Sequence, residues 1–139
     1  MAVEAFILAY QDGEPARLSF TEVLEAFGES VVGWDPQDGC LHLDFGGPDT
    51  CEVFADKDAA ETGRVRGLLI SRPIQAAGLW EPVLRILSRH HAVLFFSDDT
   101  TPRVWDPRSL KHFPEELIAT LGRPVSVRTP ADILGRKTC

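Results

Sequence analysis

The chain has 139 residues, 44% of them hydrophobic, and a formal net charge of -7. This size and apolar content fit one domain with a core of its own, whereas an acidic chain lacks the clustered Lys and Arg needed for general binding to nucleic acid or to an anionic membrane. No apolar run reaches the roughly 18–20 residues of a membrane span, and the N-terminal residues lack the basic segment of a signal peptide, so we expect a cytoplasmic protein with no membrane partner and no direct nucleic-acid partner.

The first predicted elements are a strand and a capped helix. Residues 5–10 form an apolar run typical of a strand, and the polar segment 11–15 predicts the turn after it. Ser19 and Glu22 have the spacing of a capping box, in which the two residues satisfy free backbone N–H groups at the start of a helix. Gly28 is suited to the C-terminal cap, so we expect a helix between these signals.

A short strand and a hairpin follow. Residues 31–34 predict the strand, and apolar and polar residues alternate along 40–45 and 51–56, as in a hairpin with one buried face. The pairing that we predict joins Phe45 with Cys51, Leu43 with Val53 and Leu41 with Ala55. This register directs Cys40 and Cys51 to opposite faces, so the two thiols cannot reach disulfide geometry.

The second half of the chain predicts a helix between two strands. A polar loop over residues 56–62 leads into a strand at 65–70. Residues 79–90 have apolar side chains at helical spacing, and Pro82 is compatible with this helix only in its first turn. The continuous apolar run 92–96 is typical of a strand that is buried on both faces.

The last predicted elements are short. Residues 104–105 predict a small strand, and Pro114 opens a helix that ends before Gly122. Residues 125–127 predict a final strand, and Thr129 is suited to cap a terminal helical turn.

Hairpins in the first half and a strand–helix–strand unit in the second indicate the α+β class. We expect a single domain over residues 1–139, built on a mixed, mainly antiparallel sheet with helices packed on one face. Residues 136–139 are expected to form a disordered tail.

The cysteines and histidines show no metal-binding spacing. Cys40, Cys51 and Cys139 lack a CxxC pair and are predicted to be unreactive thiols in a reducing compartment. His90 and His91 are adjacent, so on a helix end they point about 100° apart and cannot both bind one ion. His42 shares a face with Asp44, which is a conceivable start of a two-ligand site, but the alternation of polar residues on a solvated face explains this placement as well. We therefore expect no metal site and no cofactor.

The sequence also lacks the common catalytic motifs. No serine lies in a GxSxG elbow, and neither a P-loop nor a GxGxxG motif is present. The Asp98–Asp99 pair could take part in acid–base chemistry, but its place after an apolar strand and before Thr-Thr-Pro favours a turn. We expect no catalytic residues and no enzymatic activity.

Charge is distributed unevenly along the chain. Residues 1–62 hold 14 acidic and 2 basic side chains, a net charge of -12, whereas residues 63–139 hold 7 acidic and 12 basic ones, a net charge of +5. The first half could present a negative surface to a basic partner. Alternatively, the two halves could face each other, or the carboxylates could simply solvate loops and one helix face.

Several segments of the second half form a pattern that goes beyond periodicity. They are Gly67–Pro73, the Leu79–Trp80 pair that opens a helix, Val93–Phe96, Phe113–Leu117 and Leu121–Val125. This pattern, spread over residues 40–135, resembles bacterial immunity proteins encoded beside polymorphic or secretion-delivered toxins. The resemblance implies a non-enzymatic protein that binds one cognate toxin and blocks its active site or its access to substrate.

Charge adds a physical argument to this resemblance, because an acidic inhibitor associates quickly with a toxin that has a basic active-site cleft. The candidate partner-binding residues are Trp34, Asp35, Asp38, Asp49, Glu52, Phe54, Asp56 and Asp58. Trp34 or Phe54 would be the apolar anchor, although the position of Trp34 beside a turn favours a lid over the end of the core slightly more than an anchor.

Three other functions stay open. An adaptor or chaperone for a secreted effector would share the acidity and small size of the chain. A small ligand-binding domain or enzyme could use a pocket near His42, Asp44 and Arg72. A structural module without a specific ligand is the third.

Overall fold

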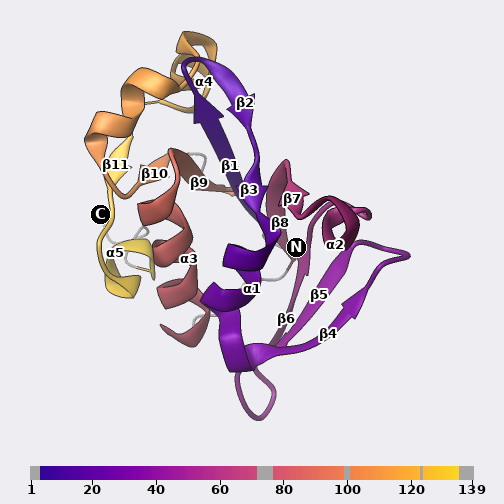
Figure 1. Cartoon of the computed structure of the whole chain (residues 1–139). Coiled ribbons are helices and arrows are strands. Elements are labelled where there is room, and N and C mark those ends of the chain that lie inside the picture. The colour runs from indigo at the N-terminus through magenta and orange to yellow at the C-terminus, as the bar shows by residue number, and fades with distance from the viewer. Residues whose placement is uncertain (1–3, 72–76, 99–100, 123, 135–139) are drawn as a thin grey trace.

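A mainly antiparallel sheet organises the chain (Figure 1). The computed structural model describes residues 4–71, 77–98, 101–122 and 124–134. In spatial order the strands are β11 (Val125–Ser126), β10 (Arg103–Val104), β9 (Ala92–Phe96), β1 (Glu4–Gln11), β8 (Gly67–Ser71), β6 (Thr50–Phe54), β5 (Cys40–Asp44) and β4 (Val31–Asp35). A further strand, β2 (Glu14–Ala16), pairs with the end of β1, and β3 (Leu18–Ser19) pairs with β7 (Arg64–Val65) in a separate small sheet.

The helices of the described residues are mostly short. The α-helices are α1 (Phe20–Phe27), α2 (Ala59–Thr62), α3 (Ala77–Arg89), α4 (Glu115–Leu121) and α5 (Pro130–Leu134), and the 3₁₀-helices are η1 (Gly28–Ser30) and η2 (Pro107–His112). Hairpins in the first half and the β8–α3–β9 unit in the second confirm the α+β class with a mixed, mainly antiparallel sheet.

Strand β1 lies in the middle of the sheet. It pairs antiparallel with β8 on one side and with β9 on the other, so β8 and β9 run parallel to each other. Helix α3 lies between these two strands in sequence, as expected for a helical crossover, and β10 pairs parallel with β11 at the far edge. The burial pattern of β9 confirms that residues 92–96 are almost entirely buried.

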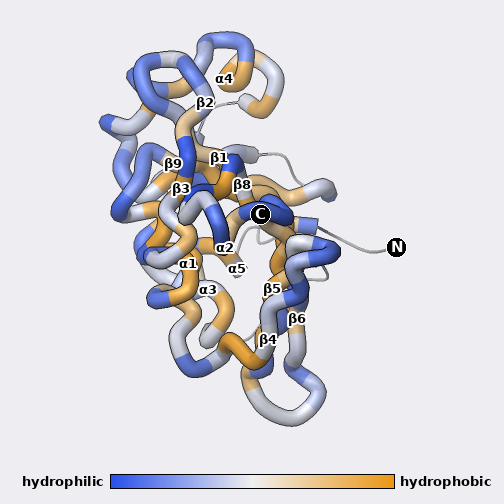
Figure 2. The backbone as a smooth tube through the Cα atoms, turned by 45° about the vertical axis from the view of Figure 1, so that its right-hand side comes forward, coloured by the Kyte–Doolittle hydropathy of each residue, from blue (hydrophilic) through white to orange (hydrophobic). Residues whose placement is uncertain are grey.

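The main core fills the space between the sheet and helices α1 and α3. Val23 and Phe27 of α1 and Val83 and Leu87 of α3 are buried there against inward-facing strand residues such as Ile7. The Ser19 hydroxyl accepts a hydrogen bond from the Glu22 backbone N–H at 3.3 Å, which confirms the predicted N-cap. In Figure 2, α1 and α3 change between hydrophobic and hydrophilic colours along their length, as helices with one buried face do.

A smaller apolar cluster covers one end of the opposite face of the sheet. Val93, Val104 and Phe113 are buried there, with Leu8 and Tyr10 of β1 packed against them together with residues of η2 and α4. The two longer helices thus share one face, as predicted, and η2 and α4 add a second layer. Both views place α4 at the end of the molecule remote from β4, β5 and β6 (Figures 1 and 2).

The predicted hairpin register is wrong by two residues. The structure pairs Leu43 with Cys51 and Leu41 with Val53, whereas the alternation of the sequence predicts Phe45 opposite Cys51. Phe45 instead leaves the strand, packs on the edge of the main core and begins the loop to β6, where its N–H donates to the Asp49 carbonyl at 2.8 Å. A shift of two residues keeps every side chain on its predicted face, so the buried face and the separation of Cys40 from Cys51 stand.

Two predicted loops contain regular structure. Asp12 and Gly13, with φ of +52° and +84°, make a two-residue turn, so residues 14–16 form β2 instead of the rest of a longer turn. Within the predicted polar loop 56–62, residues 59–62 form the single turn of α2.

The strand predicted over residues 65–70 and the helix predicted over 79–90 have different boundaries in the structure. The strand expected over residues 65–70 is divided into β7 and β8, because the Arg66 N–H donates to Asp56 Oδ2 at 3.2 Å and the chain passes from one sheet to the other there. Helix α3 begins at Ala77, so Pro82 lies in the second turn and cannot donate the helical bond to the Gly78 carbonyl. The predicted tail, residues 136–139, lies outside the described residues.

Candidate functional site

The candidate site is the outer face of the sheet, defined as the face opposite α1 and α3. Side chains alternate between the faces of a strand, so the cross-strand register places a row of apolar residues on this face. Phe54 pairs with Leu69, Leu69 with Phe6, and Phe6 with Phe95. We call these four residues the apolar row.

The apolar row crosses β6, β8, β1 and β9. Each of its members is partly exposed, and neither apolar cluster of the described residues includes them. The rings of Phe6 and Phe95 stack with their centroids 5.2 Å apart. The row is therefore a continuous apolar strip on the part of the outer face that the second cluster leaves open.

A polar row runs beside the apolar row, one pleat away. Glu4 pairs with Ser71, Ser71 with Glu52, and Glu52 with His42, which places two carboxylates directly next to the aromatic strip. Beyond this row lies a hollow of about 340 Å³, whose lining includes Asp44, Thr50 and the exposed side chain of Val32. The outer face thus combines an apolar strip, an acidic border and a hollow lined by both polar and apolar residues.

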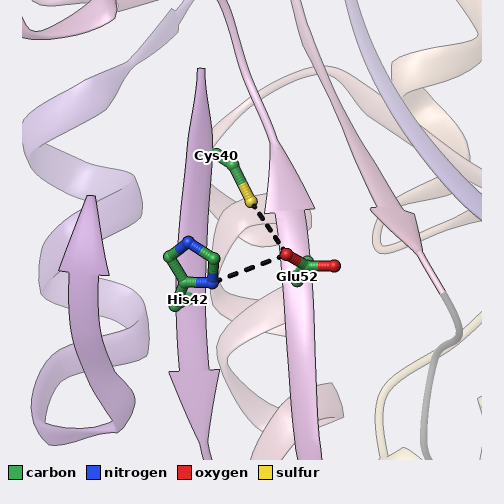
Figure 3. A group of neighbouring side chains, drawn as sticks. All are labelled: Cys40, His42 and Glu52. Atoms are coloured by element: carbon green, nitrogen blue, oxygen red, sulfur yellow. Dashed lines mark hydrogen bonds and ion pairs between the residues drawn. The ribbon is translucent and has the colours of Figure 1, made fainter. Parts of the chain in front are cut away.

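Cys40, His42 and Glu52 meet at the edge of the polar row (Figure 3). Cys40 and His42 lie two residues apart on β5, and both side chains point toward the Glu52 carboxylate on β6. Glu52 Oε2 is 3.5 Å from His42 Nδ1 and 3.7 Å from Cys40 Sγ, and one ligand atom from each residue lies within 4.8 Å of the others. Sequence spacing missed this cluster because the predicted register placed Phe54, and not Glu52, opposite His42.

The Cys40 thiol is protonated at neutral pH. Burial raises the pKa of Cys40 to about 11, and the negative charges of Glu52, Asp35 and Asp38 act in the same direction. A thiol with this pKa is a poor nucleophile, because only the thiolate attacks. The order of contacts also differs from a Cys–His–carboxylate triad, since Glu52 lies between the other two residues.

The structure divides the predicted acidic residues among three places. Asp35, Asp38, Asp56 and Asp58 lie at the end of the sheet where β4 passes into β5 and where β6 ends, and the Ala55 N–H donates to the Gly39 carbonyl there at 2.7 Å. Asp49 lies in the β5–β6 loop at the other end of these strands, and Glu52 lies on the outer face between them.

Two of these carboxylates also accept hydrogen bonds from backbone N–H groups and so stabilise the backbone around them. Asp35 Oδ1 accepts the Gln37 N–H at 2.9 Å within the β4–β5 turn, and Asp56 accepts the Arg66 N–H where the two sheets meet. Asp38, Asp49, Glu52 and Asp58 are exposed. These four residues are the ones whose charge is most available to a partner.

The two predicted aromatic anchors lie on opposite faces. Trp34 is opposite Leu41 on the core face, and its ring packs on Phe20 with the centroids 4.9 Å apart. Phe54 lies on the outer face as one end of the apolar row. The geometry therefore favours the lid interpretation for Trp34 and leaves Phe54 as the candidate anchor.

A histidine pair outside this face was not predicted. The rings of His91 and His112 stack at a centroid distance of 3.8 Å, and the Asp12 N–H donates to His112 Nδ1 at 3.2 Å. His91 follows α3 and His112 ends η2, so no local spacing in the sequence indicates that they meet.

Comparisons with protein-family models, with curated proteins and with solved structures give no match. Within the described part of the chain, no helix is both long enough and apolar enough to cross a bilayer. The outer face of the sheet is therefore the feature of this protein that bears on its function.

Proposed function

We propose that this chain is an immunity protein that binds a cognate bacterial toxin through the outer face of the sheet and so blocks the toxin's active site or its access to substrate. The observation that carries the proposal is the apolar row of Phe54, Leu69, Phe6 and Phe95 beside the carboxylates of Glu4 and Glu52. An aromatic centre with a charged border is the composition typical of protein-binding surfaces.

The two rows have different physical roles in this proposal. Burial of the partly exposed aromatic rings supplies the hydrophobic part of the affinity, of which only the surplus over the entropic cost of association appears in the binding free energy. The carboxylates attract a basic cleft during encounter and fix the orientation of the complex. Exposed Asp38 and Asp58, at the end of the same strands, extend the negative field beyond the contact itself.

The supporting experiment is co-expression with the isolated toxin domain encoded by the adjacent gene. The wild-type chain is expected to restore growth, whereas Phe54→Ala is expected to restore it poorly because the substitution removes the anchor at one end of the apolar row. Val125→Ala is the matched control, since Val125 is 49% exposed at the far edge of the sheet.

The same experiment separates the proposal from an adaptor function. An adaptor binds a targeting segment, so it would not protect cells against a toxin domain that lacks this segment. Failure of the wild-type chain to protect, or equal protection by Phe54→Ala, would contradict the proposal.

A second candidate is a ligand-binding domain or a small enzyme, and the hollow beside His42 and Asp44 favours it. Arg72, the third residue predicted for this pocket, lies outside the described residues. A metabolite that co-purifies with the chain and is lost on substitution of Asp44 would favour this candidate over toxin binding.

A further inference from the structure

We propose that Cys40, His42 and Glu52 form a binding site for Zn²⁺ on the outer face of the sheet. The three side chains offer a sulfur, an imidazole nitrogen and a carboxylate oxygen, which are the ligand types that zinc takes in proteins. Cys40 would bind as the thiolate, and its proton would be released to water as the metal binds. This inference does not depend on the proposed function, because the site is defined by its own three residues.

Two of the three distances between the ligand atoms match those around one ion, and the third is under 4.8 Å. With zinc bonds of about 2.0–2.3 Å, tetrahedral coordination separates neighbouring ligand atoms by about 3.3–3.7 Å. Glu52 Oε2 lies 3.5 Å from His42 Nδ1 and 3.7 Å from Cys40 Sγ. The 3.5 Å separation is long for a direct N–H···O hydrogen bond and lies within the spacing of neighbouring ligands around one tetrahedral ion.

The backbone holds the ligands in place. Cys40 and His42 are alternate residues of one strand, and Glu52 is the direct cross-strand partner of His42, so sheet pairing fixes all three Cα positions. Gly33 is the cross-strand partner of His42 on β4, and the imidazole packs beside its backbone, with Cδ2 3.6 Å from where a Cβ at this position would lie.

The site is closed on one side and open on the other. Cys40 is only 2% exposed, whereas the side chains of His42 and Glu52 are 45% and 52% exposed and also line the 340 Å³ hollow. Three protein ligands leave a fourth coordination position for water or for an oxygen or nitrogen atom of a ligand in the hollow. Such an open position is typical of zinc sites that bind or activate a small molecule.

Metal titration of the full chain tests the proposal. The purified protein is stripped with a chelator and titrated with Zn²⁺ by calorimetry, and Co²⁺ is added to a second sample to record the absorption band of a cobalt–thiolate bond. We expect one equivalent of Zn²⁺ to bind, and we expect the Co²⁺ band to be present. His42→Gln and Glu52→Gln alter partly exposed side chains and are expected to weaken Zn²⁺ binding at least ten-fold.

Thiol variants identify the sulfur ligand. Cys40→Ser should abolish the Co²⁺ band, whereas the control Cys51→Ala should keep it, because Cys51 faces the core. Circular dichroism confirms that each variant is folded. Absence of Zn²⁺ binding in the wild-type chain, or unchanged binding in His42→Gln and Glu52→Gln, would overturn the proposal.

Discussion

The packing of Trp34 decides between its two interpretations, an anchor for a partner and a lid over the end of the core. Its ring packs on Phe20 at the edge of the main core, and its Nε1 is buried without a hydrogen-bond partner in the described part of the chain. Its Cα partner is Leu41, a core residue. A residue in this position stabilises the fold and contributes little direct contact to a partner on the outer face.

The first prediction follows from this packing. Trp34→Phe should lower the free energy of unfolding by less than about 1.5 kcal/mol, because the lost packing is partly offset by removal of the unpaired N–H. Denaturant unfolding measures the change, and binding of the toxin domain should stay unchanged. A large loss of affinity in a folded Trp34→Phe protein would show that this ring contacts the partner.

The histidine pair predicts how stability changes with pH. Burial lowers the pKa of His91, and the positive charges of His112 and Lys111 lower it further, while Asp12 and Asp106 oppose them. The unfolded chain therefore takes up the His91 proton at a higher pH than the folded chain does. At a pH well above the ordinary histidine pKa of about 6.5, protonation of His91 has no effect on the free energy of unfolding. The free energy of unfolding then decreases as the pH falls from about 6.5 toward the lower pKa of His91 in the folded chain.

A variant isolates this contribution. His91→Phe keeps a flat ring against His112 but cannot take up a proton, so it should lose less stability than the wild type between pH 7.5 and 5.5. Denaturant unfolding of the wild type and of the variant at the two pH values gives the loss of unfolding free energy for each protein. Equal losses in the two proteins would show that protonation of His91 is not linked to unfolding.

At the scale of elements, helices and strands could be predicted from the sequence wherever a cap residue or the alternation of apolar residues determines them. Ser19 and Thr129 cap the helices that were predicted for them, with hydroxyl oxygens that accept backbone N–H groups. Alternation along β5 and β6 predicted which side chains are buried. Alternation does not distinguish registers that differ by two residues, and here the loop geometry at Phe45 decides.

That error of two residues had a direct effect on the candidate site. It hid the pairing of His42 with Glu52, and with it the contact to Cys40. The apolar row could not be predicted from the sequence either, because it forms only when β6, β8, β1 and β9 are neighbours in that order. Phe54 alone could be predicted as an anchor, since it occupies the outer side of a recognisable hairpin.

The close pairing of β1 with β8 gives a prediction for a glycine. A Cβ on Gly67 would lie 2.8 Å from the Ile7 carbonyl oxygen and 2.8 Å from Leu8 Cδ2, so alanine would push the two strands apart. We expect Gly67→Ala to lower the free energy of unfolding by about 1–3 kcal/mol.

Gly33→Ala is the matched control for this strand contact. A Cβ at Gly33 would make only ordinary van der Waals contact with His42, its closest atom lying 3.6 Å away. Thermal unfolding of the two variants should therefore differ clearly. Equal stability of Gly67→Ala and Gly33→Ala would contradict the described approach of β1 and β8.

At the scale of the whole molecule, several acidic residues of the first half of the chain gather in one region of the fold. Strands β4, β5 and β6 and the loops at their ends come from the acidic first half and form one end of the sheet, remote from α4 (Figure 1). The outer face beside them carries the apolar row. A negative end next to an apolar strip is suited to attract a basic partner first and to hold it afterwards.

Binding of the purified chain to the toxin domain of the adjacent gene tests the central claim most directly. Affinity and association rate are measured at low and high salt for the wild type, Phe54→Ala and Glu4→Lys, with Glu25→Lys on the opposite side of the sheet as the charge control. Phe54→Ala should weaken affinity at least ten-fold through faster dissociation, and Glu4→Lys should slow association with a smaller salt dependence. Unchanged affinity in both outer-face variants, or no binding by the wild type, would contradict the account.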